Sequence, residues 1–136
     1  MANGTKTGVT QPNLNCDACA RLCSFRMENK SLFPAYFNAP VPSFGSINGE
    51  ILVVGLAPGL HGANQTGRPF TGDGAGELLY PTLLKTKMAK GKYLARPDDG
   101  LEMTRARITN AVRCVPPQNK VTGAEIAACN GFLSAE

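Results

Sequence analysis

The sequence lacks the features that would place the protein in a membrane or in a secretion pathway. No apolar run reaches the 18 residues or so that a membrane-spanning helix needs. Residues 1–8 also lack the apolar core of a signal peptide. We therefore expect a cytoplasmic protein, and the length of 136 residues suits one small domain with a real core.

Histidine and the common nucleotide-binding motifs are scarce as well. His61 is the only histidine of the chain, so a metal site built on several histidines is excluded. The sequence contains no G-x-x-x-x-G-K-S/T motif, and no G-x-G-x-x-G follows its apolar run at residues 51–54. A P-loop or a dinucleotide-binding fold is therefore poorly supported.

Five cysteines are present, and their odd number argues against a disulfide framework in a reducing compartment. Cys16 and Cys19 form a C-x-x-C pair, and Cys23 follows one helical turn later. Cys114 and Cys129 lie far along the chain. This pattern leaves either a metal site or simple buried thiols.

Positive charge is concentrated late in the sequence. The net charge is +4, and nine of the 14 lysines and arginines lie between Lys85 and Lys120. Such an excess favours a polyanionic partner such as nucleic acid, although charge alone is a weak signal because many proteins without such a partner are equally basic.

Three segments show helical patterns. A helix is predicted from Asp17 to about Lys30, with the C-x-x-C pair in its first turn. A second is predicted from Gly76 onward, where Pro81 should kink it or delay its start. Thr122 and Glu125 have the spacing of a capping box, which predicts a third helix directly after Thr122.

Two segments are predicted to be strands. Ile51–Val54 is a short apolar run typical of a buried strand, and Arg107–Arg113 alternates so that Ile108, Asn110 and Val112 share a face. The prolines and glycines of residues 33–48 predict an ordered connector. A strand, loop, helix and strand in this order predict an α/β fold with a parallel sheet, which two strands alone cannot complete.

The segment Gly55–Gly76 is the most informative part of the chain. Its 22 residues hold seven of the 15 glycines, the only histidine and one acidic residue, Asp73. Glycine permits sharp turns and close approach of the backbone to a ligand, and the segment follows a strand, where α/β sheets place their ligands. Phe70 and Asp73 together suit a planar base held beside a carboxylate. The alternative is a long surface loop in which Phe70 packs into the core.

Residues 55–73 resemble the first motif of the type B (family 5) uracil-DNA glycosylases of bacteria and archaea. The related family 4 enzymes resemble the chain less, because they carry glutamate where this chain has Leu56. The resemblance also covers the following segments: Cys16–Leu22, Phe25–Arg26, Val41–Gly45, Asp98–Leu101, Ile108–Lys120 and Cys129.

The resemblance implies a monofunctional hydrolase that removes uracil, and also hypoxanthine or other deaminated bases, from DNA during base-excision repair. Asp73 would hold the attacking water and stabilise the cationic sugar, and Asn110 would donate a hydrogen bond to the departing base. Phe70 would stack on the base, which is flipped into a pocket. The remaining substrate-binding residues that it implies are Gly55, Leu56, Ala57 and His61.

The resemblance also implies a cofactor. Cys16, Cys19, Cys114 and Cys129 match the ligands of the family's 4Fe-4S cluster, which would join the first helix to the last. Zinc is less favoured because no second C-x-x-C pair occurs, but it stays open. Cys23 matches no ligand and is predicted to be a buried thiol.

The family fold implied is a three-layer α/β fold, in which helices flank a parallel sheet. We expect a disordered lead-in at residues 1–12, followed by residues 13–136 as the N-terminal portion of a single domain that is monomeric. The family's later His-Pro-Ser loop has no counterpart in this sequence. The alternative is therefore a truncated, non-catalytic fragment that an iron–sulfur cluster holds together and that binds DNA.

Overall fold

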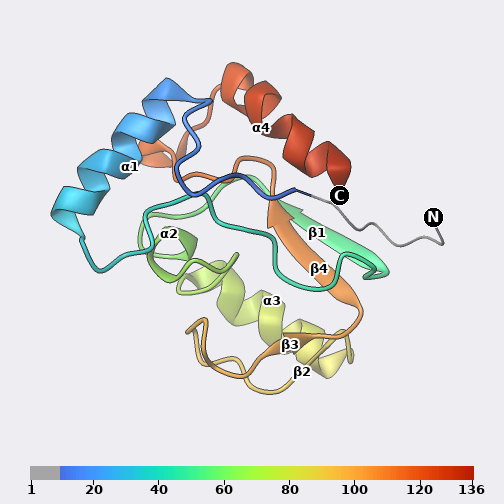
Figure 1. Cartoon of the computed structure of the whole chain (residues 1–136). Helices are drawn as coiled ribbons and strands as arrows, with labels where there is room; N and C mark the ends of the chain where they lie inside the picture. Colours follow the sequence, from blue (N-terminus) through green and yellow to red (C-terminus); the bar gives the residue numbers. More distant parts are fainter. Residues whose placement is uncertain (1–9) are drawn as a thin grey trace.

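The structure is a computed structural model that describes residues 10–136 (Figure 1). The described residues form helices and short strands. In order they are α1 (Ala20–Leu32), β1 (Ile51–Gly55), α2 (Ala63–Thr66), α3 (Gly74–Lys85), β2 (Ala89–Lys90), β3 (Glu102–Met103), β4 (Ala106–Asn110), a 3-10 turn (Pro117–Asn119) and α4 (Gly123–Ala135). Within this part of the chain, no helix is both long and apolar enough to cross a membrane.

A parallel pair of strands lies at the centre of the molecule. β1 pairs with β4 in a register that runs from Ile51 opposite Ala106 to Gly55 opposite Asn110. α1 and α4 lie on one side of this pair and α3 lies on the other (Figure 1). The α/β class, the parallel pairing and the flanking helices are therefore confirmed, and Gly55 and Asn110 end their strands side by side.

The prediction that residues 51–54 form a buried strand is only half right. The strand forms, but Ile51, Leu52 and Val54 are 45%, 39% and 48% exposed. Among residues 10–136, β1 pairs with β4 alone, so its outer edge is left open. β4 has neighbours on both edges, because Phe44 forms an antiparallel bridge to Ile108, and Ile108 is fully buried.

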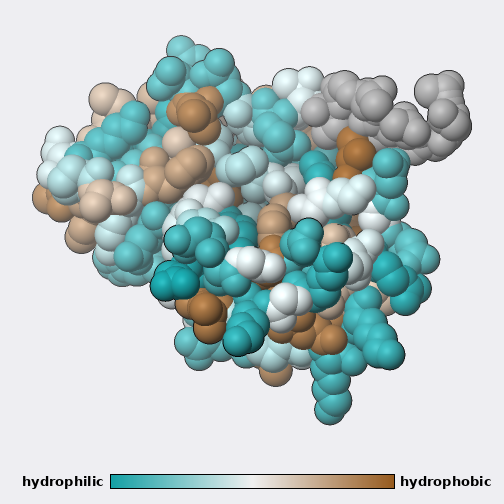
Figure 2. Space-filling view, turned by 60° about the horizontal axis from the view of Figure 1, so that its bottom comes forward, coloured by the Kyte–Doolittle hydropathy of each residue, from teal (hydrophilic) through white to brown (hydrophobic). Residues whose placement is uncertain are grey.

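The core lies between α3 and β4. Tyr80 and Leu83 of α3 pack with Ala106 and Ile108 of β4, together with Ala89 and Leu101. β2 and β3, which were not predicted from the sequence, form a two-residue antiparallel pair, and β2 contacts α3. The face that they occupy mixes apolar patches with hydrophilic side chains (Figure 2).

The first helix begins later than predicted. α1 starts at Ala20 instead of Asp17, and Cys19 is its N-cap residue, with extended backbone angles. The prediction that the C-x-x-C pair occupies the first helical turn is therefore wrong, because Cys16 and Cys19 precede the helix. Of the predicted lead-in, residues 1–9 lie outside the described residues, while Pro12 is buried.

α3 begins earlier than predicted, at Gly74, because Asp73 is its N-cap and accepts a hydrogen bond from the Gly76 N–H. Pro81 lies inside the helix without delaying its start. The strand predicted at residues 107–113 spans Ala106–Asn110, so Val112 lies in the turn that follows. Residues 33–48 form a connector without a helix, as predicted.

α4 carries the predicted capping box. The Thr122 hydroxyl accepts from the Glu125 N–H at 3.1 Å, and the Glu125 carboxylate accepts from the Thr122 N–H at 2.9 Å. We expect Thr122→Ala to lower the free energy of unfolding by about 1 kcal/mol, because one helix-end N–H loses its partner. Urea denaturation measures the change, and Ser134→Ala, at an exposed position of α4, is the control. Equal stability of the two variants would contradict this prediction.

Candidate active site and cysteine cavity

A pocket opens at the carboxyl ends of β1 and β4. It is a hollow of about 520 Å³ that is open to solvent. Its walls include Gly55, Leu56, Ala57, Phe70, Asp73 and Asn110. These are the predicted catalytic and substrate-binding residues with the exception of His61. The pocket is also lined by four residues for which no role was predicted: Pro58, Gly59, Ala63 and Ala75.

Gly55 and Asn110 form the floor of the pocket. Asn110 is 3% exposed, and its backbone carbonyl accepts from Arg113 Nε at 2.8 Å. A Cβ atom at position 55 would lie 2.5 Å from Asn110 Oδ1 and 2.6 Å from Phe70 Cζ. Position 55 therefore has to be glycine for the amide and the ring to approach each other there.

Asp73 lies at the N-terminal end of α3 and faces two glycines. Its Oδ1 accepts from the Gly76 N–H at 3.4 Å, which leaves Oδ2 directed toward Gly59 and Gly62. A Cβ atom at Gly62 would lie 2.4 Å from Oδ2, so this cradle requires glycine. The N-terminus of a helix favours a negative charge, and the carboxylate is half-buried at the pocket wall.

Phe70 adopts a backbone conformation that is rare for a bulky residue. Its φ is 55°, in the left-handed region. The first turn of α3 packs directly on its carbonyl group, because a Cβ atom at Gly76 would lie 1.7 Å from Phe70 O. The conformation directs the Phe70 ring toward Gly55.

His61 lies outside this pocket, in a neighbouring hollow that also includes Asp73. It is exposed, and its Nδ1 lies 2.8 Å from the Tyr36 hydroxyl. Its ring meets Phe33 and Tyr36 edge-on, with centroids 5.4 and 5.7 Å away. The structure therefore does not place His61 in the pocket lined by the other predicted site residues. The two hollows share Gly59 and Asp73.

The five cysteines line a second cavity, between α1, the turn after β4, and α4. Burial raises the pKa of the Cys114 thiol to about 11, and burial likewise raises the pKa values of Cys19 and Cys129. The prediction that Cys23 is buried is wrong, because it is half-buried: the first turn of α1 directs it into this cavity.

Arg26 is the residue of this cavity whose role the sequence did not reveal. It is 3% exposed; Nη1 donates to Cys114 Sγ at 3.3 Å, and Nη2 donates to the Cys16 carbonyl at 2.7 Å. Its Nε is buried and has no hydrogen-bond partner among residues 10–136. A buried cation with a free donor suits an anionic group in the cavity, which neutral thiols do not provide.

The cysteines around this cavity suit an iron–sulfur cluster as its ligands. Thiolates are its usual ligands, and each binds a different iron atom of a 4Fe-4S cube. Within residues 10–136, no three cysteine, histidine or acidic side chains are placed to hold one metal ion. Cys16, Cys19, Cys114 and Cys129 nevertheless surround one cavity, from segments that are distant in the sequence.

Comparison with known proteins places these features in context. A family model described as "Uracil DNA glycosylase superfamily" matches residues 42–136. The "Type-5 uracil-DNA glycosylase" of Pyrobaculum aerophilum is 40% identical over 127 residues, covering 90% of this chain and 56% of the relative. The protein of the same name from Thermus thermophilus is 44% identical over 126 residues, covering 89% and 57%.

A more distant relative is the "Type-4 uracil-DNA glycosylase" of Sulfurisphaera tokodaii. It is 39% identical over 97 residues, covering 71% of this chain and 38% of the relative. The chain thus spans about half the length of the type-5 relatives that it matches.

Proposed function

The chain belongs to the uracil DNA glycosylase superfamily, and from this premise we propose that it excises uracil from DNA by hydrolysing the N-glycosidic bond. One observation carries the proposal: Phe70 and Asp73 of the glycine-rich segment and Asn110, at the end of β4, line a single pocket at the sheet edge. An aromatic ring can stack on a flipped base, a carboxylate can accept the proton of a water, and an amide can donate a hydrogen bond to the departing base.

Base binding comes first in the proposed mechanism. The target nucleotide is extruded from the duplex, which costs a few kcal/mol and is easiest for a mispaired base. The Phe70 ring stacks on the base, while the backbone of residues 55–57 lines the pocket. The Asn110 amide is withdrawn from water, so its hydrogen bond to the base edge competes little with solvent.

The bond then breaks between the sugar C1′ and the base nitrogen. The bonding electron pair leaves with the base, where the Asn110 N–H stabilises the developing negative charge. The Asp73 carboxylate stabilises the cationic sugar and accepts a proton from the attacking water, whose oxygen bonds to C1′. The departing base takes a proton from solvent, and Asp73 releases to solvent the proton that it accepted, so the products are the free base and an abasic site.

We propose that Cys16, Cys19, Cys114 and Cys129 hold a 4Fe-4S cluster. Bound there, the cluster would join α1 to α4 and to the turn after β4, and this role is structural. The Arg26 guanidinium would donate hydrogen bonds toward the cluster from inside the cavity.

DNA that contains uracil or another deaminated base is the proposed partner. The region between Lys85 and Lys120, where positive charge is concentrated, has exposed lysines that can contact phosphates: Lys85, Lys87, Lys90 and Lys92. We further propose that residues 13–136 form part of one domain that acts as a monomer in the cytoplasm.

Base excision by the 136-residue chain tests this function. Oligonucleotides that carry one deoxyuridine or one deoxyinosine, single-stranded and duplex, are incubated with the protein and then cleaved with alkali. We expect strand cleavage at deoxyuridine. A folded protein that retards DNA without cleavage at either base would instead support a non-catalytic fragment.

Stacking by Phe70 leads to a separate prediction. We expect Phe70→Leu to lower the single-turnover excision rate by roughly 5- to 150-fold, since base stacking on an aromatic ring contributes about 1–3 kcal/mol. Leucine keeps an apolar side chain at this site but lacks the flat face. Leu78→Ala, at an exposed apolar position of α3, is the control. Wild-type rates in Phe70→Leu would show that the ring does not stack on the base.

A further inference from the structure

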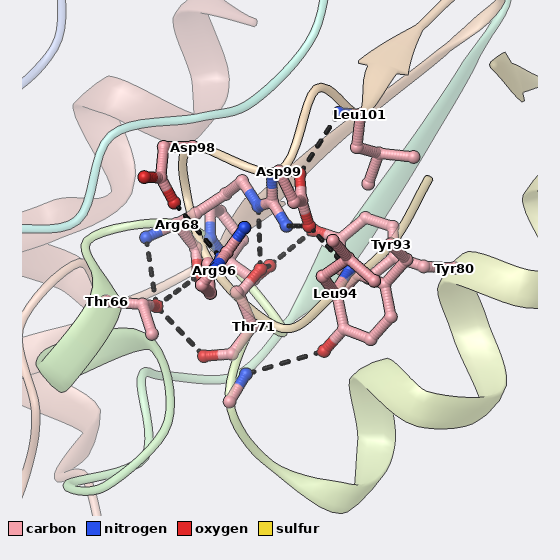
Figure 3. Close-up of polar contacts among 12 residues, drawn as sticks. Thr66, Arg68, Thr71, Tyr80, Tyr93, Leu94, Arg96, Asp98, Asp99 and Leu101 are labelled. Atoms are coloured by element: carbon pink, nitrogen blue, oxygen red, sulfur yellow. Dashed lines mark hydrogen bonds and ion pairs between the residues drawn. The ribbon is translucent and has the colours of Figure 1, made fainter. Parts of the chain in front are cut away.

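A buried ion pair lies beside the pocket and takes no part in the proposed chemistry. Arg68 Nη1 and Nη2 donate to Asp99 Oδ1 and Oδ2 at 2.9 and 2.8 Å (Figure 3). The side chains are only 5% and 0% exposed. The pair joins two loops that are 31 residues apart in sequence, residues 66–73 and residues 94–101.

Both carboxylate oxygens of Asp99 also accept hydrogen bonds from backbone N–H groups of its own loop. Its Oδ2 accepts from the Leu94 N–H at 2.9 Å, and its Oδ1 accepts from the Leu101 N–H at 3.1 Å. Burial by itself would raise the pKa of Asp99, but the Arg68 guanidinium and these two N–H groups outweigh it and hold the pKa well below its usual range. The carboxylate is therefore a fixed, charged anchor.

The Arg68 guanidinium is fixed by aromatic rings as well. Its central carbon lies 5.0 Å from the Phe44 ring centroid, 5.5 Å from that of Tyr80 and 5.9 Å from that of Tyr93. A planar fork can meet a carboxylate with two parallel bonds and contact rings with its faces at the same time. Lysine cannot reproduce both contacts.

The same guanidinium holds the loop that carries Phe70. Arg68 Nε donates to Thr71 Oγ1 at 2.8 Å, and that hydroxyl donates to the Pro69 carbonyl at 3.1 Å. The Tyr80 hydroxyl also donates to the Pro69 carbonyl, and the Thr66 hydroxyl donates to the Thr71 carbonyl at 2.9 Å. The neighbours of Phe70 on both sides are therefore fixed.

Phe70 itself is in the left-handed region, a conformation that persists only where the surroundings over-determine it. Its two neighbours supply that constraint, and Asp73 follows three residues later. A change in the Phe70 backbone would move the ring and would also move the N-cap carboxylate that begins α3.

We infer that the Arg68–Asp99 pair is a positioning device of the active site: it holds residues 68–73 in the conformation that presents the Phe70 ring and the Asp73 carboxylate to one pocket. This inference rests on the proposed function for its kinetic consequence. That the pair holds residues 68–73 in one conformation is inferred from the contacts alone and does not depend on the proposed function.

The test compares Asp99→Asn and Arg68→Lys with Val41→Ala. Val41 is buried in the connector before β1 and takes part in none of the hydrogen bonds of Arg68 or Asp99 given above, so Val41→Ala weakens the fold and leaves the ion pair in place. We expect Asp99→Asn and Arg68→Lys to lower the single-turnover excision rate by about 100-fold, since a displacement of about 1 Å at the reacting groups has that effect. Affinity for an oligonucleotide carrying 2′-fluoro-2′-deoxyuridine, which resists cleavage, should fall less than about tenfold.

A second readout does not depend on activity. In hydrogen-exchange mass spectrometry, the peptide that covers residues 66–76 should exchange faster in Asp99→Asn than in wild type and in Val41→Ala. If Asp99→Asn does not fold, the double variant Arg68→Met with Asp99→Leu replaces it, because an apolar pair preserves buried packing. That variant should also show fast exchange.

The outcomes separate the two proposals. Rates of Asp99→Asn that equal those of Val41→Ala at the same folded fraction would overturn the positioning role, as would unchanged exchange of residues 66–76. If the wild-type chain excises no base, the proposed function fails, and the exchange experiment alone decides whether the pair holds the loop.

Discussion

Replacing Asp73 with asparagine is expected to lower the rate of uracil excision by about 10³-fold and to leave the fold intact. A positioned general base contributes about 10²- to 10⁴-fold, and an amide can neither accept the proton of the water nor stabilise the cationic sugar by charge. Asparagine is nearly isosteric with aspartate, so it fits the cradle formed by Gly59 and Gly62.

The choice of substitution matters because Asp73 has two roles in the structure. It caps α3 as well as lining the pocket. Asparagine is as good an N-cap as aspartate, whereas alanine removes the cap and costs about 1 kcal/mol of stability. Asp73→Asn should therefore unfold like wild type, and Asp73→Ala should be less stable, although both lose excision.

Single-turnover cleavage of a deoxyuridine oligonucleotide and urea denaturation measure the two effects. Glu77→Gln is the matched control, because it removes a negative charge from the first turn of the same helix at an exposed position outside the pocket. An excision rate in Asp73→Asn within tenfold of wild type would show that another group activates the water.

Phe70 and Asp73 could be predicted as parts of one site because they lie close to each other along the chain. Phe70 and Asp73 belong to one glycine-rich segment after a strand, and the strand order places Asn110 opposite Gly55. The capping box at Thr122 could be predicted for the same reason, because its bonds join residues three apart.

The missed features depend on distant parts of the chain. Whether the apolar residues of β1 are buried depends on which other elements pack on the strand. The pattern of a four-residue apolar run does not reveal those elements. β2 and β3 are two residues long, too short to produce a pattern. The pairing of Arg68 with Asp99 is equally non-local, since both motifs are visible in the sequence but nothing in it joins them.

Replacing a cysteine of the cavity is the second change for which we expect a large effect, here on cofactor content and on Tm. We expect Cys114→Ala to abolish the proposed 4Fe-4S cluster, because three thiolates would leave one iron without a protein ligand, and Cys114 lies beside the buried Arg26. A group that binds only the folded state stabilises it, so its loss should lower Tm by on the order of 10 °C, given about 4 °C per kcal/mol at this size.

Cys23→Ala is the matched control because Cys23 lines the same cavity but is not among the four proposed ligands. Iron and sulfide content and the visible absorbance of the purified protein distinguish the two variants: Cys23→Ala should retain the cluster, and Cys114→Ala should lose it. Loss of iron from both would make Cys23 a ligand. Zinc in place of iron in the wild-type protein would contradict the proposed cluster.

Cys114 lies four residues after Asn110 in the sequence. Loss of the Cys114 ligand should loosen the turn that joins them and displace Asn110 in the pocket. Uracil excision by Cys114→Ala should therefore fall even at temperatures where the variant is folded.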